Sequence, residues 1–206
     1  DINAIFIKQK ETGYERIGVS TTHYYPEVVF NMGTQKRINI IEDILYRINE
    51  QYSLNLNIDK DETWSMSFQG NRLNHRRLEL LEVQHKDTEQ GVIESTNILM
   101  NFIENELLPA YDLFDDIREI DKRINGEGEN FWEDDIGSSK PFNLGGRFFE
   151  RRLIIAKLCN NLKFDMIADR YFTYLEKAME KQTGQPYHFD RNDLSLPVPA
   201  TIKYLK

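Results

Sequence analysis

The stretch AIFIKQKETGYERIGVSTTH at residues 4–23 determines how we expect the start of this chain to fold. Its two arms, 4–8 and 14–23, are rich in β-forming residues, and the Thr12-Gly13 pair between them is typical of a turn. β-Forming residues continue to residue 30, but Pro26 lacks the amide donor that a central strand requires. The sequence therefore predicts a hairpin or meander that bends at Pro26 and ends at Gly33-Thr34.

The period of the apolar residues changes after this segment. Between residues 37 and 52, isoleucine and leucine recur every three or four positions, which predicts an amphipathic helix. Residues 64–69 alternate between apolar and polar side chains, as a half-buried strand does, and residues 77–85 are interpreted as a further strand. The first part of the chain is therefore expected to combine several strands with one helix.

The later part of the chain repeats its apolar residues with the period of a helix. A helix, the longest expected, starts from a cap at Asp87 or Thr88 and extends up to Pro109. Further helices are expected at 110–114, 117–124, 148–159 and from 164 to about Gly184. The last two should pack as an antiparallel helical hairpin, and the proline-containing tail after them should be extended.

These patterns predict an α+β protein with a small, mostly antiparallel N-terminal sheet packed on helices and a C-terminal antiparallel helical hairpin. At 206 residues the chain is within the range of one domain, so we expect a single domain over 1–206. Within it we expect a strand-rich half with one helix (1–85), a helical half (86–184) and an extended tail (185–206).

The charge of the chain is unevenly distributed along the sequence. The formal net charge is −8, which argues against a nucleic-acid backbone as the main partner, because phosphate binding needs a basic face. Residues 101–140 hold twelve acidic and four basic residues, a surplus of eight that equals the net charge of the whole chain. A basic protein partner fits this local excess.

Cysteine content and hydropathy indicate the compartment in which the protein is expected to work. Cys159 is the single cysteine, so the sequence offers neither an intrachain disulfide nor a thiolate metal cluster, and a reducing, cytoplasmic compartment is the natural expectation. No stretch reaches the length of consecutive apolar residues that a membrane span needs. We therefore expect a protein without a membrane or cofactor requirement.

A cluster of aromatic and acidic residues, Phe131-Trp132-Glu133-Asp134-Asp135, lies in the long irregular segment 127–146. Such loops are often functional. Three interpretations are open: a solvated acidic loop anchored by a buried Trp132, a protein contact patch, or a site for a divalent cation. The predicted binding residues are this cluster together with three preceding aspartates, Asp112, Asp115 and Asp116.

Other polar residues give no recognisable catalytic or metal motif. The four histidines, at positions 23, 75, 85 and 188, have neither the i, i+4 spacing nor the His-Glu-x-x-His pattern of zinc sites. Cys159 and the serines lack a nucleophile motif. The basic pairs Arg76-Arg77 and Arg151-Arg152 can grip an anion or form internal salt bridges, and abundant acids nearby favour the second use. The sequence therefore predicts no catalytic residue.

Four segments resemble small bacterial α+β proteins of unassigned function, some of which are encoded beside toxins and act as immunity proteins. They are the strand pair at 6–30, the Trp64-Ser-Met-Ser-Phe68 strand, the helix ending in Glu106-Leu-Leu-Pro109 and the Arg151-Arg152-Leu-Ile-Ile-Ala156 helix with its successor. The resemblance implies a non-enzymatic protein with a protein partner, and it carries over no functional residues.

The leading hypothesis is thus a protein-binding module, of immunity type, that neutralises a toxin through its acidic surface. The first alternative is a hydrolase whose Asp, Glu and His residues are brought together in a pocket by the fold. The second is a scaffold protein of a larger assembly, which requires a large exposed apolar patch.

Overall fold

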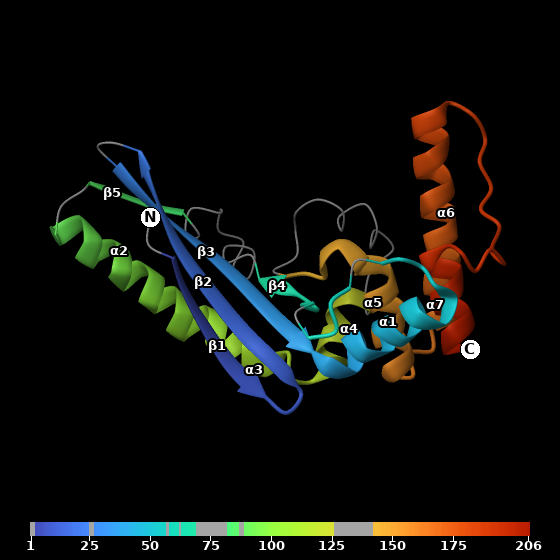
Figure 1. The fold of residues 1–206 in the computed structure, drawn as a ribbon, viewed down its shortest axis with the longest axis horizontal. Coiled ribbons are helices and arrows are strands. Elements are labelled where there is room, and N and C mark those ends of the chain that lie inside the picture. The colour runs from blue at the N-terminus through green and yellow to red at the C-terminus, as the bar shows by residue number, and fades with distance from the viewer. Residues whose placement is uncertain are drawn as a thin grey trace. The chain divides into compact units, whose positions relative to one another are not determined.

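A computed structural model describes residues 3–24, 27–56, 58–61, 63–68, 82–86, 89–125 and 142–206 of the chain. Within these ranges it has the predicted α+β architecture, with an antiparallel sheet and helices (Figure 1). The fold divides into two compact units. Unit 1 comprises Asp1–Asn39, Trp64–Asp116 and Gly128–Gly145, and unit 2 comprises Ile40–Thr63, Ile117–Glu127 and Gly146–Lys206. The single domain with its three successive parts stays a prediction.

Unit 1 is built on a four-stranded antiparallel sheet. Its strands are β1 (Asn3–Lys10), β2 (Gly13–Tyr24), β3 (Glu27–Ile38) and β5 (Glu82–Lys86), in the order β1-β2-β3-β5. Gly13, the second residue of the predicted turn and the first of β2, has φ +149°, and a Cβ there would lie 2.0 Å from the carbonyl oxygen of Arg37. Only glycine fits this close approach of two strands. The predicted hairpin is confirmed, with its turn at Glu11 and Thr12, one residue earlier than expected.

The third strand is longer than the sequence indicated. β3 continues through Gly33 and Thr34, so the expectation that this pair ends the strands is wrong. Partners beyond β2 extend it: the hydroxyl of Thr34 bonds to both backbone groups of Phe68 (2.6 and 2.8 Å), and the amide of Lys36 donates to Met66 (2.8 Å). The following helix consequently starts at Asn39 rather than at residue 37.

A second, smaller ladder pairs β4 (Ser67–Phe68) with β6 (Phe142–Asn143). The strand predicted over 64–69 is therefore shorter than expected, with Met66 in an isolated bridge to Lys36. β5 confirms the end of the strand predicted over 77–85, whose first residues lie outside the described ones.

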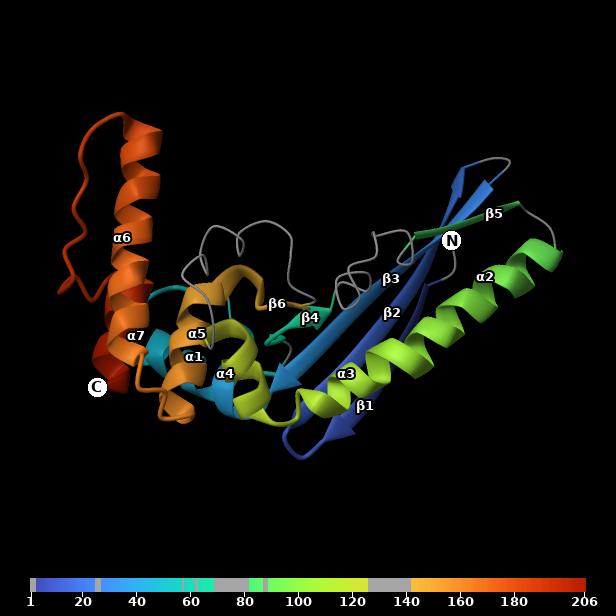
Figure 2. The same cartoon turned by 180° about the vertical axis from the view of Figure 1, so that it is seen from behind.

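One helical run lies along the sheet of unit 1 (Figures 1 and 2). It consists of α2 (Glu89–Phe102), a π-helical turn at Ile103–Leu107 labelled η3, and α3 (Leu108–Leu113). The helix does not end at Pro109 as predicted, because this proline occupies the first turn of α3, where its missing amide is tolerated. Directly before it, the backbone hydrogen bonds of the π turn join residues five positions apart instead of four.

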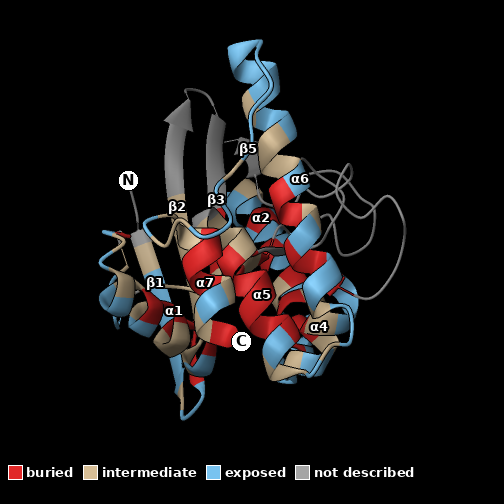
Figure 3. Cartoon of the chain, turned by 90° about the vertical axis from the view of Figure 1, so that its right-hand side faces the viewer, coloured by how far each residue is buried: buried red, intermediate tan, exposed pale blue. Residues whose placement is uncertain are grey.

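Unit 2 is helical. It contains α1 (Asn39–Tyr52) from Ile40 onward, α4 (Ile117–Asn125), α5 (Phe148–Leu158), α6 (Phe164–Thr183) and α7 (Pro197–Leu205), with a 3-10 turn at Gly145–Arg147 labelled η4 before α5. α5 forms its centre, and Figure 3 shows this helix mostly in the colour of buried residues. Every residue of α5 from Glu150 to Ala156 is buried.

The C-terminal segment corrects one expectation. A tail that stays extended over 185–206 is wrong, because Pro197–Leu205 forms α7 and buries Val198, Ala200 and Leu205. Pro197 is suited to the first position of a helix, since its fixed φ already matches and its missing amide costs nothing there. α6 ends as predicted, at Gly184 in the left-handed conformation (φ 69°). The antiparallel hairpin of α5 and α6 stays a prediction.

None of the helices in the described part of the chain combines the length and the apolar character that a membrane crossing needs.

Candidate functional site

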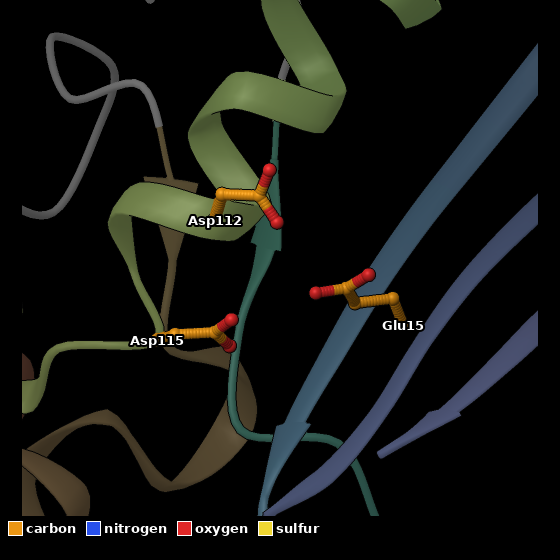
Figure 4. Close-up of side chains that lie close together, drawn as sticks. All are labelled: Glu15, Asp112 and Asp115. Atoms are coloured by element: carbon orange, nitrogen blue, oxygen red, sulfur yellow. The ribbon is translucent and has the colours of Figure 1, made fainter.

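Three carboxylates gather where α3 meets the sheet of unit 1. Glu15 comes from β2, Asp112 from α3 and Asp115 from the turn after α3, and their oxygens lie within 4.8 Å of one another (Figure 4). The Glu15 side chain is buried (3% exposed), whereas Asp112 is 71% exposed and Asp115 is 42% exposed. The group therefore runs from the interior to the surface.

Two lysines of the sheet bind these carboxylates. Lys36 Nζ, which is buried, lies 3.0 Å from Glu15 Oε1, 2.6 Å from Asp115 Oδ1 and 2.8 Å from the carbonyl oxygen of Tyr111. Lys10 Nζ contacts Glu15, lies 2.7 Å from Asp115 Oδ2 and 3.7 Å from Asp112 Oδ1. We call these five residues, Lys10, Glu15, Lys36, Asp112 and Asp115, the lysine-acid cluster.

Strand register explains why the cluster forms. Glu15 is directly opposite Lys8 on β1 and Lys36 on β3, so the three side chains share one face of the sheet. Tyr111 fixes α3 on the same face, because its hydroxyl lies 2.9 Å from the carbonyl oxygen of Arg16 and 3.2 Å from that of Gln35. Asp112 and Asp115 are thereby placed over the lysines.

The charged forms of Glu15, Asp115 and Lys10 are favoured by their partners. Burial alone would raise the pKa of Glu15, but hydrogen bonds from Lys10 and Lys36 outweigh it and hold that pKa below its usual 4.5. The same opposition leaves the pKa of Asp115 below its usual 3.8. Burial lowers the pKa of Lys10, but its bonds to Asp115 and Glu15 raise it above 10.5 overall. These three residues are therefore ionised near neutral pH.

The charge balance of the cluster indicates an ion-pair network. Three carboxylates face two ammonium groups, and Lys8 approaches Glu15 to 3.6 Å as well. The ammonium groups occupy the space and supply the charge that a divalent cation would bring to such a carboxylate set. What the arrangement does chemically is hold α3 against β2 and β3.

The structure separates the predicted binding residues into two groups. Asp112 and Asp115 are brought together in the lysine-acid cluster, and Asp116 lies exposed beside them. Phe131, Trp132, Glu133, Asp134 and Asp135 lie outside the described residues. Sequence reasoning missed Glu15, Lys10 and Lys36. The predicted turn at Thr12-Gly13 did not give the register that pairs Lys8 with Glu15, and nothing local revealed that α3 would cover these side chains.

A second feature of unit 1 is an apolar flank on the helical run. The buried face of α2 contains Ser95, Leu99 and Phe102. Val92, Ile93 and Met100 are 41–48% exposed and fall within an arc of about 100° on the helix. We call these three residues the α2 flank. Ile98, Leu108 and Leu113 are further exposed apolar residues of the same run.

Unit 2 contains a groove of 620 Å³ between α6, α7 and the segment that joins them. Its lining includes the apolar residues Phe172, Leu194 and Ile202. Four of the five charged residues that line it are paired internally: Arg191 lies 2.7 Å from Asp169, and Lys206 lies 3.4 Å from Asp165. Arg191 also covers the ring of Phe172, 4.7 Å from its centroid. These contacts account for those four charges without a ligand.

The groups that a hydrolase needs do not converge in the part of the chain that the structure describes. His188 is the one histidine whose side chain is described there, and it is 89% exposed, 3.7 Å from Glu176. The described carboxylates of the lysine-acid cluster are bound to lysines instead.

Comparison with known proteins adds no information about these sites. No family model, no curated protein and no solved structure matches this chain.

Proposed function

We propose that this chain is a protein-binding module whose contact surface is the outer side of the α2–η3–α3 run. The observation that carries the proposal is the α2 flank, because Val92, Ile93 and Met100 remain exposed beside the buried face of the helix. Exposed apolar side chains that share one face of a helix mark interaction surfaces far more often than isolated ones do.

The acidic residues define the chemistry of the partner. Glu104 and Asp112 are exposed on the same helical run, and Asp116 follows directly after it. A partner with an apolar contact region bordered by basic residues would match this surface in both polarity and charge. The sequence-predicted loop residues Phe131, Trp132, Glu133, Asp134 and Asp135 belong to this proposal as an additional acidic contact.

Asp115 receives a different role from the one the sequence suggested. It binds both Lys10 and Lys36, so its charge stabilises the fold and is already neutralised within the chain. Asp112 touches the cluster only through Lys10 at 3.7 Å and is mostly exposed. Of the two, Asp112 is the residue that we assign to steering a basic partner. An immunity-type role, with a toxin as the partner, is the specific form suggested by the resemblance of segment order.

The test compares two surfaces of the same protein. The partner captured by the wild-type chain is identified and purified, and its affinity is measured for an Ile93→Glu, Met100→Glu double variant. Placing two carboxylates in a buried apolar contact should weaken binding by about tenfold or more. Leu162→Glu is the matched control, since Leu162 is fully exposed in unit 2 and should tolerate the change.

The proposal fails if the double variant keeps its fold, shown by an unchanged circular dichroism spectrum, and binds like the wild type. It also fails if Leu162→Glu weakens binding as much as the double variant does, because the contact would then include unit 2.

A further inference from the structure

The sheet of unit 1 ends in an unusually open edge. β1 is the terminal strand in the order β1-β2-β3-β5 and pairs only with β2 among the described strands. Its eight residues are in continuous register from Asn3 opposite Ser20 to Lys10 opposite Gly13. It contains no proline and no bulge, which are two common ways in which proteins protect a free strand edge.

The side chains of β1 add apolar surface to this edge. Ile5, Phe6 and Ile7 are 55%, 63% and 55% exposed. Because neighbours in a strand point to opposite faces, both faces of the sheet are apolar at this edge. A strand that is added to β1 would cover all three side chains and satisfy the outward-facing backbone groups at the same time.

The lysines of β1 leave the apolar half unprotected. Lysine on an edge strand usually repels an incoming strand. Here Lys10 is held by Glu15 and Asp115, so its charge is offset within its own chain, and Lys8, which is 61% exposed, lies beyond the apolar half of the strand. The preceding residues, 3–7, carry no charge.

We propose that the occupant of this edge is a second copy of the chain, bound through antiparallel pairing of β1 with β1 around Phe6. In this register Phe6 of one chain is opposite Phe6 of the other. Ile5 of each chain is opposite Ile7 of the other, which gives two equivalent Ile5–Ile7 pairs. The pairing is self-complementary, as the two-fold symmetry of a homodimer requires. Two sheets then join into one continuous sheet.

The charges of β1 select this orientation. In the antiparallel register each Lys8 is opposite Ala4 of the other chain, and the two Lys8 positions are four residues apart, about 13 Å along the strand. That exceeds the screening length of about 8 Å at physiological ionic strength. A parallel arrangement would instead place Lys8 next to Lys8, which is destabilising.

Sedimentation velocity over a concentration series tests the dimer. The wild-type chain should show a reversible monomer–dimer equilibrium. Phe6→Lys should raise the dimer dissociation constant by about tenfold or more, because it places two like charges directly opposite each other. A wild-type chain that remains monomeric, or a dimer that Phe6→Lys leaves unchanged, would overturn the proposal. A strand from another protein would then be the alternative occupant.

Disulfide trapping tests the register and needs no charged substitution. In a Cys159→Ser background, Phe6→Cys should cross-link rapidly, because facing residues have Cα atoms about 4.5–5.5 Å apart, within the usual range for a disulfide. Ala4→Cys, on the same face of the same strand, should cross-link slowly, since the two copies would lie about 13 Å apart. Equal rates for the two variants would exclude this pairing even if Phe6→Lys failed to fold.

The inference and the proposed function fail separately. The Ile93→Glu, Met100→Glu variant should lose its partner and keep the dimer, whereas Phe6→Lys should lose the dimer. If the α2 variant abolishes dimerisation instead, the copies meet through the α2 flank and the pairing of β1 is wrong.

Discussion

The two units distribute their apolar residues differently. Nine of the thirteen large apolar side chains that are exposed in the described chain belong to unit 1, and all nine lie on β1, α2 and α3. Both units bury charged side chains, Glu15 and Lys36 in unit 1 and Glu42, Arg151 and Arg152 in unit 2. The units therefore differ in exposed apolar surface, of which unit 1 has more, and not in buried charge.

The largest effect on stability is expected from breaking the buried ion pair between Glu42 and Arg151 in unit 2. The Arg151 guanidinium donates to both carboxylate oxygens of Glu42, at 2.8 and 2.9 Å, and both side chains are buried. Arg151→Met leaves a buried carboxylate without this partner and should lower the free energy of unfolding by about 3–5 kcal/mol. Urea denaturation followed by circular dichroism measures this loss.

A double variant is the control for this pair. Glu42→Leu with Arg151→Met removes both charges and should recover most of the lost stability, because two apolar side chains need no partner. If the double variant is as unstable as Arg151→Met alone, packing and not charge pairing is what Arg151 supplies.

An intermediate effect is expected from pH, because the stability of the two units should change with pH in opposite directions. The pKa of Glu15 in unit 1 is lowered by its lysines, whereas burial raises the pKa of Glu150 in unit 2 above the usual 4.5. A lowered pKa contributes stability that is present above 4.5 and lost as the pH falls through the folded value. A raised pKa contributes stability that is present below 4.5 and lost as the pH rises through the folded value.

Amide hydrogen exchange, corrected for intrinsic rates, resolves this contrast residue by residue. Protection in β2 and α3 should decrease on acidification below 4.5, and protection in α5 should decrease as the pH rises from that value. Glu15→Gln should weaken the first dependence, because Asp115 also has a lowered pKa, and Glu150→Gln should remove the second. Parallel changes in both units, with either variant, would contradict the assignment.

The smallest effect distinguishes two neighbouring aspartates of the lysine-acid cluster. Asp112→Asn should cost less than about 1 kcal/mol of unfolding free energy, because an exposed charge at 3.7 Å from Lys10 gains little in water. Asp115→Asn should cost more, since Asp115 binds the buried Lys36 at 2.6 Å. Thermal unfolding of the two variants measures the difference. Equal losses would show that Asp112 also has a structural role and is not reserved for association.

The sequence predicted the elements of this fold well where their pattern is local. The hairpin around Thr12-Gly13, the apolar period of α1 and the stop at Gly184 all depend on residues next to one another in the chain. β3 was predicted too short because its last residues, 34–38, pair with residues 13–17 of β2 and gain further partners in Met66 and Phe68, about thirty positions away. Pro109 was interpreted as an end because the π turn before it leaves no recognised sequence signal.

The candidate site was predictable only in part for the same reason. Local charge counting found Asp112, Asp115 and Asp116 but could not tell which of them would be neutralised. That distinction depends on Lys36, 79 positions from Asp115, and on Tyr111, which fixes α3 over Lys10 and Lys36. The exposure of the α2 flank likewise depends on which face of α2 meets the sheet, which apolar period alone does not decide.

The π turn at Ile103–Leu107 gives the helical run a tolerance in chain length. It accommodates about one residue more than an α-helical turn, so the residues after it keep the phase of the helix before it. Deleting a single residue there would convert the turn to α-helix and leave Tyr111 at the carbonyls of Arg16 and Gln35. A deletion within α2 would instead rotate the residues on its two sides by about 100° relative to each other.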